Sequence, residues 1–141
     1  MRPYRRHRIL LVTALATALA LGCKADTSGL STLTLDELRS RLGEASAPIL
    51  CDVNNADTRE RHGVIPGALL LTSYRDYLPH DELPPDRARE LVFYCHSERC
   101  GAAASAARKA TAAGYSRVSV LPAGIRGWAS SGLPVDPAPE G

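Results

Sequence analysis

The sequence lacks the features of a nucleic-acid-binding protein. Aromatic residues make up 5% of its 141 residues, and no stripe of lysine and arginine is interleaved with them. The chain has 17 Lys and Arg against 15 Asp and Glu, but four of the basic residues lie in the first 22 positions, which contain no acidic residue. The remainder therefore has 13 basic and 15 acidic residues, a formal charge of −2 with histidine neutral. No nucleic-acid partner is expected.

The sequence also lacks an apolar run long enough to span a membrane, which takes about 20 residues. Residues 9–21 are apolar or small, follow four arginines and precede Gly22 and Cys23. This layout is typical of a secretory signal. The ending LALGC resembles the lipobox of bacterial lipoproteins, although Ala20 stands where leucine is usual.

We therefore expect an exported protein anchored to a lipid membrane. Residues 1–22 are the expected signal peptide of the lipoprotein type, and Cys23 is the expected lipidated N-terminus. An ordinary cleaved signal peptide and an uncleaved anchor are the alternatives. Because Lys24 rather than an aspartate follows Cys23, the usual sorting pattern of a Gram-negative envelope predicts the outer membrane, on its periplasmic side.

Cysteines are too few for a disulfide framework. With Cys23 assigned to lipid, Cys51, Cys95 and Cys100 remain, an odd number that leaves at least one thiol unpaired within the chain. The spacing of Cys95 and Cys100 fits no common zinc finger or ribbon, so no metal ion and no cofactor is expected. Cys51 lies inside an apolar run and is expected to be a buried structural residue.

Apolar runs alternate with helical patterns along the rest of the chain. Thr34 and Glu37 form a capping box before a leucine-patterned helix. The alternation predicts an α/β fold, a single three-layer domain over residues 32–136 with a mostly parallel central sheet flanked by helices. Residues 23–31 are expected to be a flexible tether, and residues 137–141 a disordered tail. The expected strands are residues 48–53, 68–71, 89–95 and 116–121, and the expected helices lie within residues 34–42, 54–62, 101–113 and 123–132.

The clearest strand, residues 89–95, runs directly into a short polar loop and then into an alanine-rich helix. In a parallel sheet, ligands and chemistry gather where such loops follow strand ends. Unpaired N–H groups and the positive end of the helix dipole favour an anion there, and a thiolate is an anion. We therefore expect a lowered pKa for a nucleophilic Cys95, with His96 and Arg99 as additional cationic groups.

Four ordered motifs resemble those of the rhodanese family. They are ILCDV, GVIPGA, the cysteine loop after LVFY, and GIRGW followed by GLPV, and the resemblance as a whole covers the chain from Leu33 to Val135. The resemblance implies a sulfurtransferase whose cysteine takes a sulfane sulfur from thiosulfate, a polysulfide or a persulfide, becomes a persulfide itself, and passes the sulfur to a thiol acceptor. It assigns the catalytic nucleophile to Cys95 and the surrounding anion-binding loop to His96, Ser97, Glu98, Arg99, Cys100 and Gly101.

The loop departs from the family pattern at two positions. Cys100 stands where an arginine is usual, and Gly101 follows in place of serine or threonine. A cysteine-loop phosphatase or arsenate reductase is not expected, because Gly101 occupies the place of the arginine that would grip phosphate oxygens. Cys100 has two interpretations: it resolves a persulfide or sulfenic acid on Cys95 and leaves a disulfide, or it packs beneath the start of the helix.

Two other functions stay open. Cys95 and Cys100 also suit a thiol–disulfide redox protein, whose disulfide a thioredoxin-like partner would reduce. A rhodanese-like module without catalysis would sense or bind a ligand.

Several residues outside the loop are expected to be structural. Asp52 ends a strand, where we favour hydrogen bonds from neighbouring backbone N–H groups over a role as general base. Pro66 and Gly67 form a turn, and Trp128 is expected in the core with its indole N–H on a local acceptor. The basic residues of the short helix at 54–62, including Arg59 and His62, are expected to be exposed.

Overall fold

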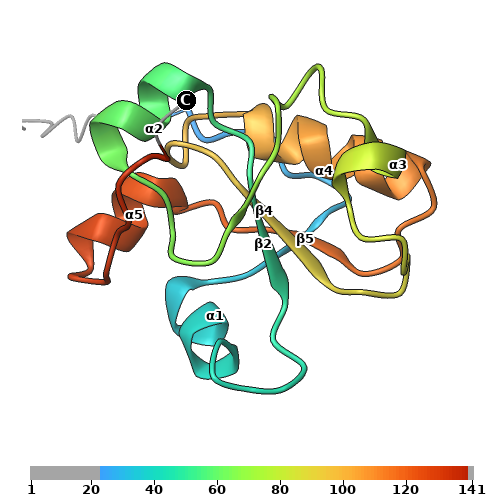
Figure 1. Cartoon of the computed structure of the whole chain (residues 1–141), viewed down its shortest axis with the longest axis horizontal. Coiled ribbons are helices and arrows are strands. Elements are labelled where there is room, and N and C mark those ends of the chain that lie inside the picture. The colour runs from blue at the N-terminus through green and yellow to red at the C-terminus, as the bar shows by residue number, and fades with distance from the viewer. Residues whose placement is uncertain (1–22, 140–141) are drawn as a thin grey trace, which may run out of the picture.

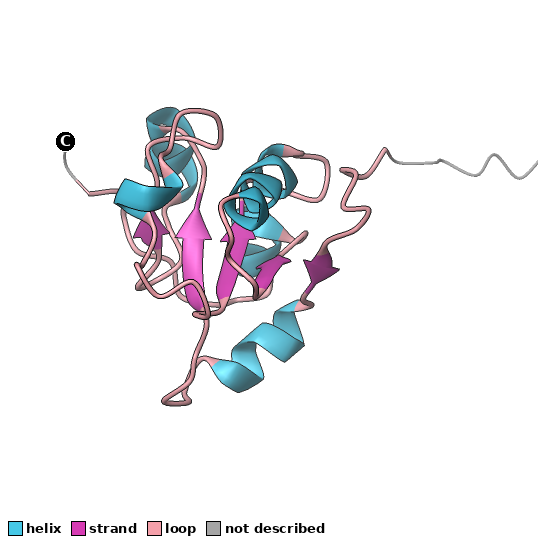
Figure 2. Cartoon of the chain, turned by 90° about the vertical axis from the view of Figure 1, so that its right-hand side faces the viewer, coloured by secondary structure: helices cyan, strands magenta, loops and turns pink. Residues whose placement is uncertain are grey.

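The computed structural model describes residues 23–139, which form an α/β fold around a five-stranded sheet (Figure 1). Every strand pairing is parallel, in the order β1-β5-β4-β2-β3. Figure 2 shows the strands pointing the same way with helices on both sides, so the predicted fold class is confirmed. The strands are β1 (Ser31–Thr32), β2 (Ile49–Asp52), β3 (Leu69–Leu70), β4 (Leu91–Tyr94) and β5 (Val118–Val120), and the helices are α1 (Leu35–Arg41), α2 (Ala56–His62), α3 (Pro79–Glu82), α4 (Ala102–Ala112) and α5 (Gly124–Ser130).

Alternate side chains of the central strands contribute to two separate cores. In β4, Leu91 and Phe93 belong to one core and Val92 and Tyr94 to the other, as the two-residue period of a strand requires. The alanines of α4 pack in the first core, and residues of α1 and α5 pack in the second. Because β4 is buried on both faces, the loop that follows it starts from the centre of the sheet.

The longer predicted elements are present, and their ends follow from local hydrogen bonds. At the start of α1, the Thr34 side chain accepts from the Glu37 N–H at 3.2 Å, and the Glu37 carboxylate accepts from the Thr34 N–H at 2.7 Å. This is the predicted capping box. Two short elements, β1 and α3, were not predicted.

Residues 24–30, which we expected to be a flexible tether, contact α4 and the loop after β4. The Ala25 N–H donates to the carbonyl of Glu98 at 2.7 Å. Arg108 of α4 donates to the carbonyl of Ser28 at 3.1 Å. The chain therefore approaches the end of β4 before it enters β1.

The C-terminal segment pairs with the chain after α2. The backbone N–H groups of Val64 and Asp136 each donate to the other's carbonyl, at 2.9 and 3.0 Å. The expected signal peptide, residues 1–22, lies outside the described residues, as do residues 140 and 141 of the expected tail. Among residues 23–139, no helix is both long enough and apolar enough to cross a membrane.

Candidate active site

The first turn of α5 holds the loop after β4 through two backbone hydrogen bonds. The Ile125 N–H donates to the carbonyl of Cys95 at 2.9 Å, and the Arg126 N–H donates to the carbonyl of His96 at 3.0 Å. These donors have no partner inside their own helix, so a helix start satisfies the backbone of the loop. The GIRGW motif therefore positions the cysteine, although it is distant in sequence.

Gly124 makes this close contact possible. Its φ is +59°, and a Cβ at this position would lie 2.6 Å from the carbonyl oxygen of Cys95. Any side chain would push α5 away from the loop or strain the backbone. The sequence resemblance named the motif, but only the structure shows that this glycine fits against Cys95.

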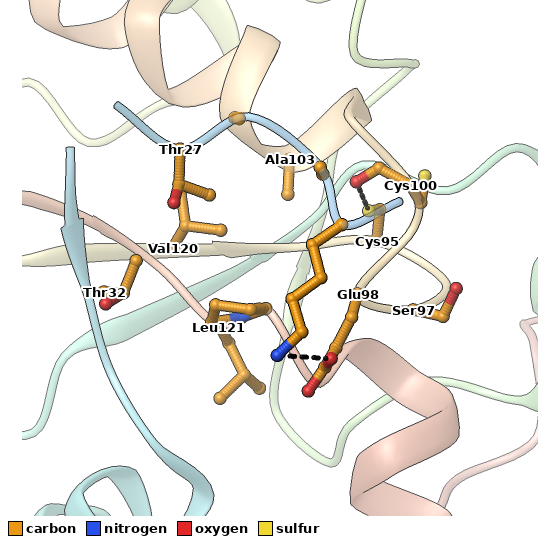
Figure 3. A pocket seen from close by; sticks show the side chains of 13 residues that line it. Thr27, Thr32, Cys95, Ser97, Glu98, Cys100, Ala103, Val120 and Leu121 are labelled. Carbon is orange, nitrogen blue, oxygen red and sulfur yellow. Dashed lines mark hydrogen bonds and ion pairs between the residues drawn. The ribbon is translucent and has the colours of Figure 1, made fainter. Parts of the chain in front are cut away.

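The Cys95 side chain is 3% exposed and ends inside the loop. Its thiol donates to the carbonyl of Cys100 at 3.0 Å (Figure 3). The backbone N–H groups of Ser97 and Ala103 favour its ionised form. The structure therefore places Cys95, Ser97 and Cys100 together, as the loop pattern predicts.

The pKa values of the two cysteines differ from expectation. A hydrogen bond between the two thiol side chains, distinct from the bond to the Cys100 carbonyl, is the largest cause that raises the pKa of Cys95, followed by burial. The same hydrogen bond lowers the pKa of Cys100 to about 5, with help from the backbone N–H groups of Ala102 and His96. The expected lowered pKa of Cys95 is wrong for the resting pair, because the thiols share a proton and the loop amides stabilise the charge on Cys100. The contacts of the pair therefore favour the negative charge on Cys100 and the proton on Cys95.

A cavity of about 250 Å³ opens beside Cys95, between the end of β4 and the end of β5. We call it the β5-side cavity. Figure 3 shows Cys95 and Cys100 at one end of it and Thr32 and Val120 at the other. The Cys95 sulfur therefore borders a space in which a small molecule fits. The segment before β1 also contributes to the wall, through Lys24, Ala25 and Thr27.

His96 does not add positive charge to the loop. Burial, followed by the charges of His62 and Arg126, lowers the pKa of His96 below its ordinary value of 6.5, so the ring is neutral at pH 7. Its ring lies 4.7 Å from that of His62, centroid to centroid. His62, expected to be solvated, is exposed, and its ring contacts that of His96 at an interplanar angle of 47°. The expected cationic help from His96 is therefore wrong.

Arg99 and Glu98 lie at the outside of the loop. Arg99 is exposed and lines an open groove together with Arg126. The Glu98 carboxylate pairs with Lys24 at 3.2 Å, with both side chains more than half exposed. Such an exposed pair contributes about 1 kcal/mol at most. Gly101, also exposed, is the residue before α4.

Asp52 is fully buried at the end of β2. Its Oδ1 accepts from the Asn54 N–H at 2.7 Å and from Arg59 Nε at 3.2 Å. Arg59 also donates to the carbonyls of Asp52 and Leu71 at 3.0 and 2.7 Å, which connects the ends of β2 and β3. The expected exposure of Arg59 is therefore wrong: its side chain is 13% exposed, because it turns inward to a buried carboxylate.

The remaining predicted residues lie away from the cysteine pair. Pro66 and Gly67 form a turn closed by the Ala68 N–H on the carbonyl of Ile65 at 3.0 Å. Trp128 is buried, and its indole N–H donates to the carbonyl of Pro134 at 2.7 Å.

Cys51 is fully buried in β2, where burial raises the pKa of its thiol to about 12. Cys23 is exposed at the start of the described residues. None of the four cysteines, all of which lie within the described residues, forms a disulfide. Within residues 23–139, no cluster of three or more His, Cys, Asp or Glu side chains is arranged to hold a metal ion.

Three functional features escaped the sequence analysis. Lys24, Ala25 and Thr27 line the β5-side cavity, Gly124 supports the loop, and Asn54 is a buried polar side chain near the loop. A polar residue directly after an expected strand often lies at a ligand site, and this pattern could have identified Asn54. No periodicity marks residues 24–27, because their contacts come from tertiary packing alone.

The profile of the rhodanese-like domain family matches residues 34–131. A sulfurtransferase from Allochromatium vinosum is 36% identical over 107 residues, which cover 75% of this chain and 94% of the relative. The solved rhodanese-like domain of an Anabaena sp. protein has a TM-score of 0.63 and 24% identity, covering 78% of this chain and 85% of that one. A thiosulfate sulfurtransferase from Pseudomonas aeruginosa has a TM-score of 0.63 and 21% identity, covering 78% of this chain and 21% of that one.

The two solved structures show the shared fold. The family match does more, because it extends over more than half of the chain and includes β4, the cysteine loop, α4 and α5. On these grounds the chain belongs to the rhodanese-like domain family.

Proposed function

We propose that this protein is a sulfurtransferase that carries a sulfane sulfur as a persulfide on Cys95. The observation that carries the proposal is the Cys95 sulfur beside a small cavity, with the N–H groups of Ser97 and Ala103 favouring its charged form. A persulfide is an anion near neutral pH, so the same amides would stabilise it. The relative that is 36% identical is itself a sulfurtransferase, which supports the assignment.

Loading starts with a proton transfer inside the cysteine pair. Cys100 is the thiolate at rest, so it accepts the proton of Cys95 when a donor enters the β5-side cavity. The Cys95 sulfur then attacks the outer sulfur of thiosulfate. The S–S bond of thiosulfate breaks, and sulfite leaves with the bonding electrons. A polysulfide or a small persulfide loads Cys95 by the same displacement.

Discharge has two branches. An acceptor thiolate that attacks the outer sulfur takes it away and returns Cys95 as a thiolate. In the other branch, Cys100 attacks the inner sulfur, hydrosulfide leaves, and a Cys95–Cys100 disulfide forms. That disulfide needs a dithiol reductant of the thioredoxin type before the next cycle.

The intact mass of the purified domain after incubation with thiosulfate or a polysulfide tests the proposal. We expect a gain of one sulfur atom that a reducing thiol removes. Cys95→Ser removes the nucleophile and is expected to show no gain, whereas Cys51→Ala, in the buried β2 strand, is expected to load normally. Loading of Cys95→Ser to the wild-type level would contradict the proposal.

A thiol–disulfide redox function is the second candidate, because the low pKa of Cys100 and its contact with Cys95 also suit a resolving pair. The same mass measurement separates the functions. A loss of two hydrogens without added sulfur and without release of hydrosulfide supports the redox pair, because the resolving branch of the sulfurtransferase releases hydrosulfide. An unchanged mass with every donor supports a module that only binds.

We also propose that the protein is exported and held on a membrane through lipid on Cys23. The exposure of Cys23 supports this, because a lipid at that position would not disturb the core. The contacts of residues 24–30 would then place the β5-side cavity a few residues from the anchor.

A further inference from the structure

The β4 loop separates two cavities. The β5-side cavity lies between the ends of β4 and β5. A second cavity, of about 180 Å³, lies on the other side, where the chain leaves β2 and β3. We call it the β2-side cavity. Its lining includes Asn54, Thr58, Tyr74, His96, Cys100 and Ala102.

Cys100 lines both cavities, whereas Cys95 lines only the β5-side one. This difference follows from the loop: Cys95 is the last residue before it and faces α4, while Cys100 is five positions on. A thiol in the β2-side cavity would therefore meet Cys100 before Cys95.

The β2-side cavity also contains an unused hydrogen-bond donor. Asn54 is 5% exposed, and its Nδ2 has no acceptor among the described residues. A buried amide normally has a partner, so an unpaired one beside a cavity indicates a ligand that carries an oxygen acceptor. The backbone of Asn54 is held independently, since its N–H donates to Asp52.

We propose that the β2-side cavity is the acceptor site, which binds a small thiol carrying a carbonyl-type oxygen on Asn54, and that Cys100 relays the sulfur to it from Cys95. This inference rests on the proposed sulfurtransferase function and adds the acceptor class and the route. The donor enters on one side of the β4 loop and the acceptor on the other.

The relay is a sequence of two sulfur displacements without net oxidation. The proton that Cys100 took up during loading moves to the outer sulfur of the Cys95 persulfide, and the Cys100 thiolate attacks that sulfur. A bond from Cys100 to the outer sulfur forms, and the bond to Cys95 breaks with its electrons on Cys95, which then takes the proton of the incoming acceptor thiol. The acceptor thiolate then attacks the outer sulfur on Cys100. It leaves as a small persulfide, and Cys100 returns to a thiolate.

The test uses two probe thiols on the full domain loaded with thiosulfate or polysulfide. After the donor is removed, 2-mercaptoacetamide or 1-propanethiol is added, and intact mass follows the loss of the added sulfur. Because only 2-mercaptoacetamide offers an oxygen to Asn54, we expect the ratio of its discharge rate to that of 1-propanethiol to be about tenfold higher in the wild type than in Asn54→Leu, the contribution of one hydrogen bond. Asn54→Leu is expected to lose this preference while it still loads Cys95.

Three further variants make the test specific. Asn54→Asp keeps the size but replaces the donor with an acceptor, so it should lose the preference as well. Arg61→Gln, on the exposed face of α2, should keep it. Cys100→Ser should load on Cys95, given enough time, but discharge to 2-mercaptoacetamide at least about tenfold more slowly than the wild type.

Two results would overturn the inference while leaving the sulfurtransferase intact. One is an unchanged preference in both Asn54 variants, which would show that the β2-side cavity does not bind the acceptor. The other is a fully loaded Cys100→Ser that discharges at the wild-type rate, which would exclude the relay. Failure of the wild type to load at all would instead contradict the proposed function, and this inference with it.

Discussion

Cys100 has the lower pKa of the two loop cysteines because Cys95 hydrogen-bonds to it and the backbone N–H groups of Ala102 and His96 stabilise its charge. The pKa of Cys95 is raised for the complementary reason. Since one proton is shared, the loop holds one negative charge from about pH 5 upward. An isolated cysteine, with a pKa of about 8.5, would be mostly protonated at pH 7.

Removing Cys95 should therefore make Cys100 less acidic. In Cys95→Ala the hydrogen bond that lowers the pKa of Cys100 is lost, so the pH at which Cys100 reacts with iodoacetamide should move upward from about 5. Peptide-resolved mass spectrometry across pH 4–9 gives the profile, and Cys51, fully buried, is an internal control that should stay unlabelled. An unchanged Cys100 profile would show that Cys95 does not set its acidity.

Arg59 should be important for stability although it lies far in sequence from Cys95 and Cys100. Arg59→Ala would leave the fully buried Asp52 carboxylate without its charged partner. Breaking a buried ion pair from one side costs about 3 kcal/mol or more in the free energy of unfolding. Urea denaturation measures this cost, with Arg61→Ala on the exposed face of α2 as the matched control. Equal midpoints for the two variants would refute the structural role.

At the scale of elements, the first turn of α5 sets the position of the β4 loop. Its N–H groups donate to the carbonyls of Cys95 and His96. The helix approaches the loop this closely because Gly124 has no Cβ to clash with the Cys95 carbonyl. The start of a seven-residue helix therefore acts on the active-site backbone rather than on a ligand.

Gly124→Ala tests this contact against a matched glycine. Both Gly124 and Gly132 have positive φ, but a Cβ on Gly132 would meet nothing within 4 Å. Gly132→Ala should therefore show only the backbone strain, about 1 kcal/mol of unfolding free energy. Gly124→Ala should lose more stability and also load sulfur more slowly, because the loop is displaced. Similar thermal melts and loading rates for the two variants would contradict the account.

The elements that the sequence predicted well have strong local signals. The capping box marked α1, and the apolar run of β4 before the alanine-rich α4 marked the site itself. Two elements had no such signal: β1 is two residues long, and α3 is a single turn that begins at Pro79. The inward turn of Arg59 and the proton shared by Cys95 and Cys100 also escaped, because both depend on distances between segments.

At the scale of the whole molecule, the proposed anchor and the donor cavity are close in the chain. Lys24 and Ala25 contact Glu98 and line the β5-side cavity, directly after Cys23. A lipid on Cys23 would therefore hold this end of the sheet near the membrane surface. Donors would reach the cavity from the envelope compartment.

Fractionation of a Gram-negative host tests the anchor. The full chain should sediment with membranes, and Cys23→Ser, which cannot be lipidated, should appear in the soluble envelope fraction. The variant should keep its sulfur loading, since Cys23 does not line the β5-side cavity. Recovery of both proteins in the soluble fraction would exclude a lipid anchor.

The most direct measurement of the central claim locates the added sulfur by peptide-resolved mass spectrometry after a short exposure to thiosulfate or polysulfide. In the wild type, the account predicts that the extra sulfur appears first on Cys95. It predicts no added sulfur in Cys95→Ser and added sulfur on Cys95 in Cys100→Ser. Sulfur that appears on Cys100 in Cys95→Ser as fast as in the wild type would contradict the claim that Cys95 receives it from the donor.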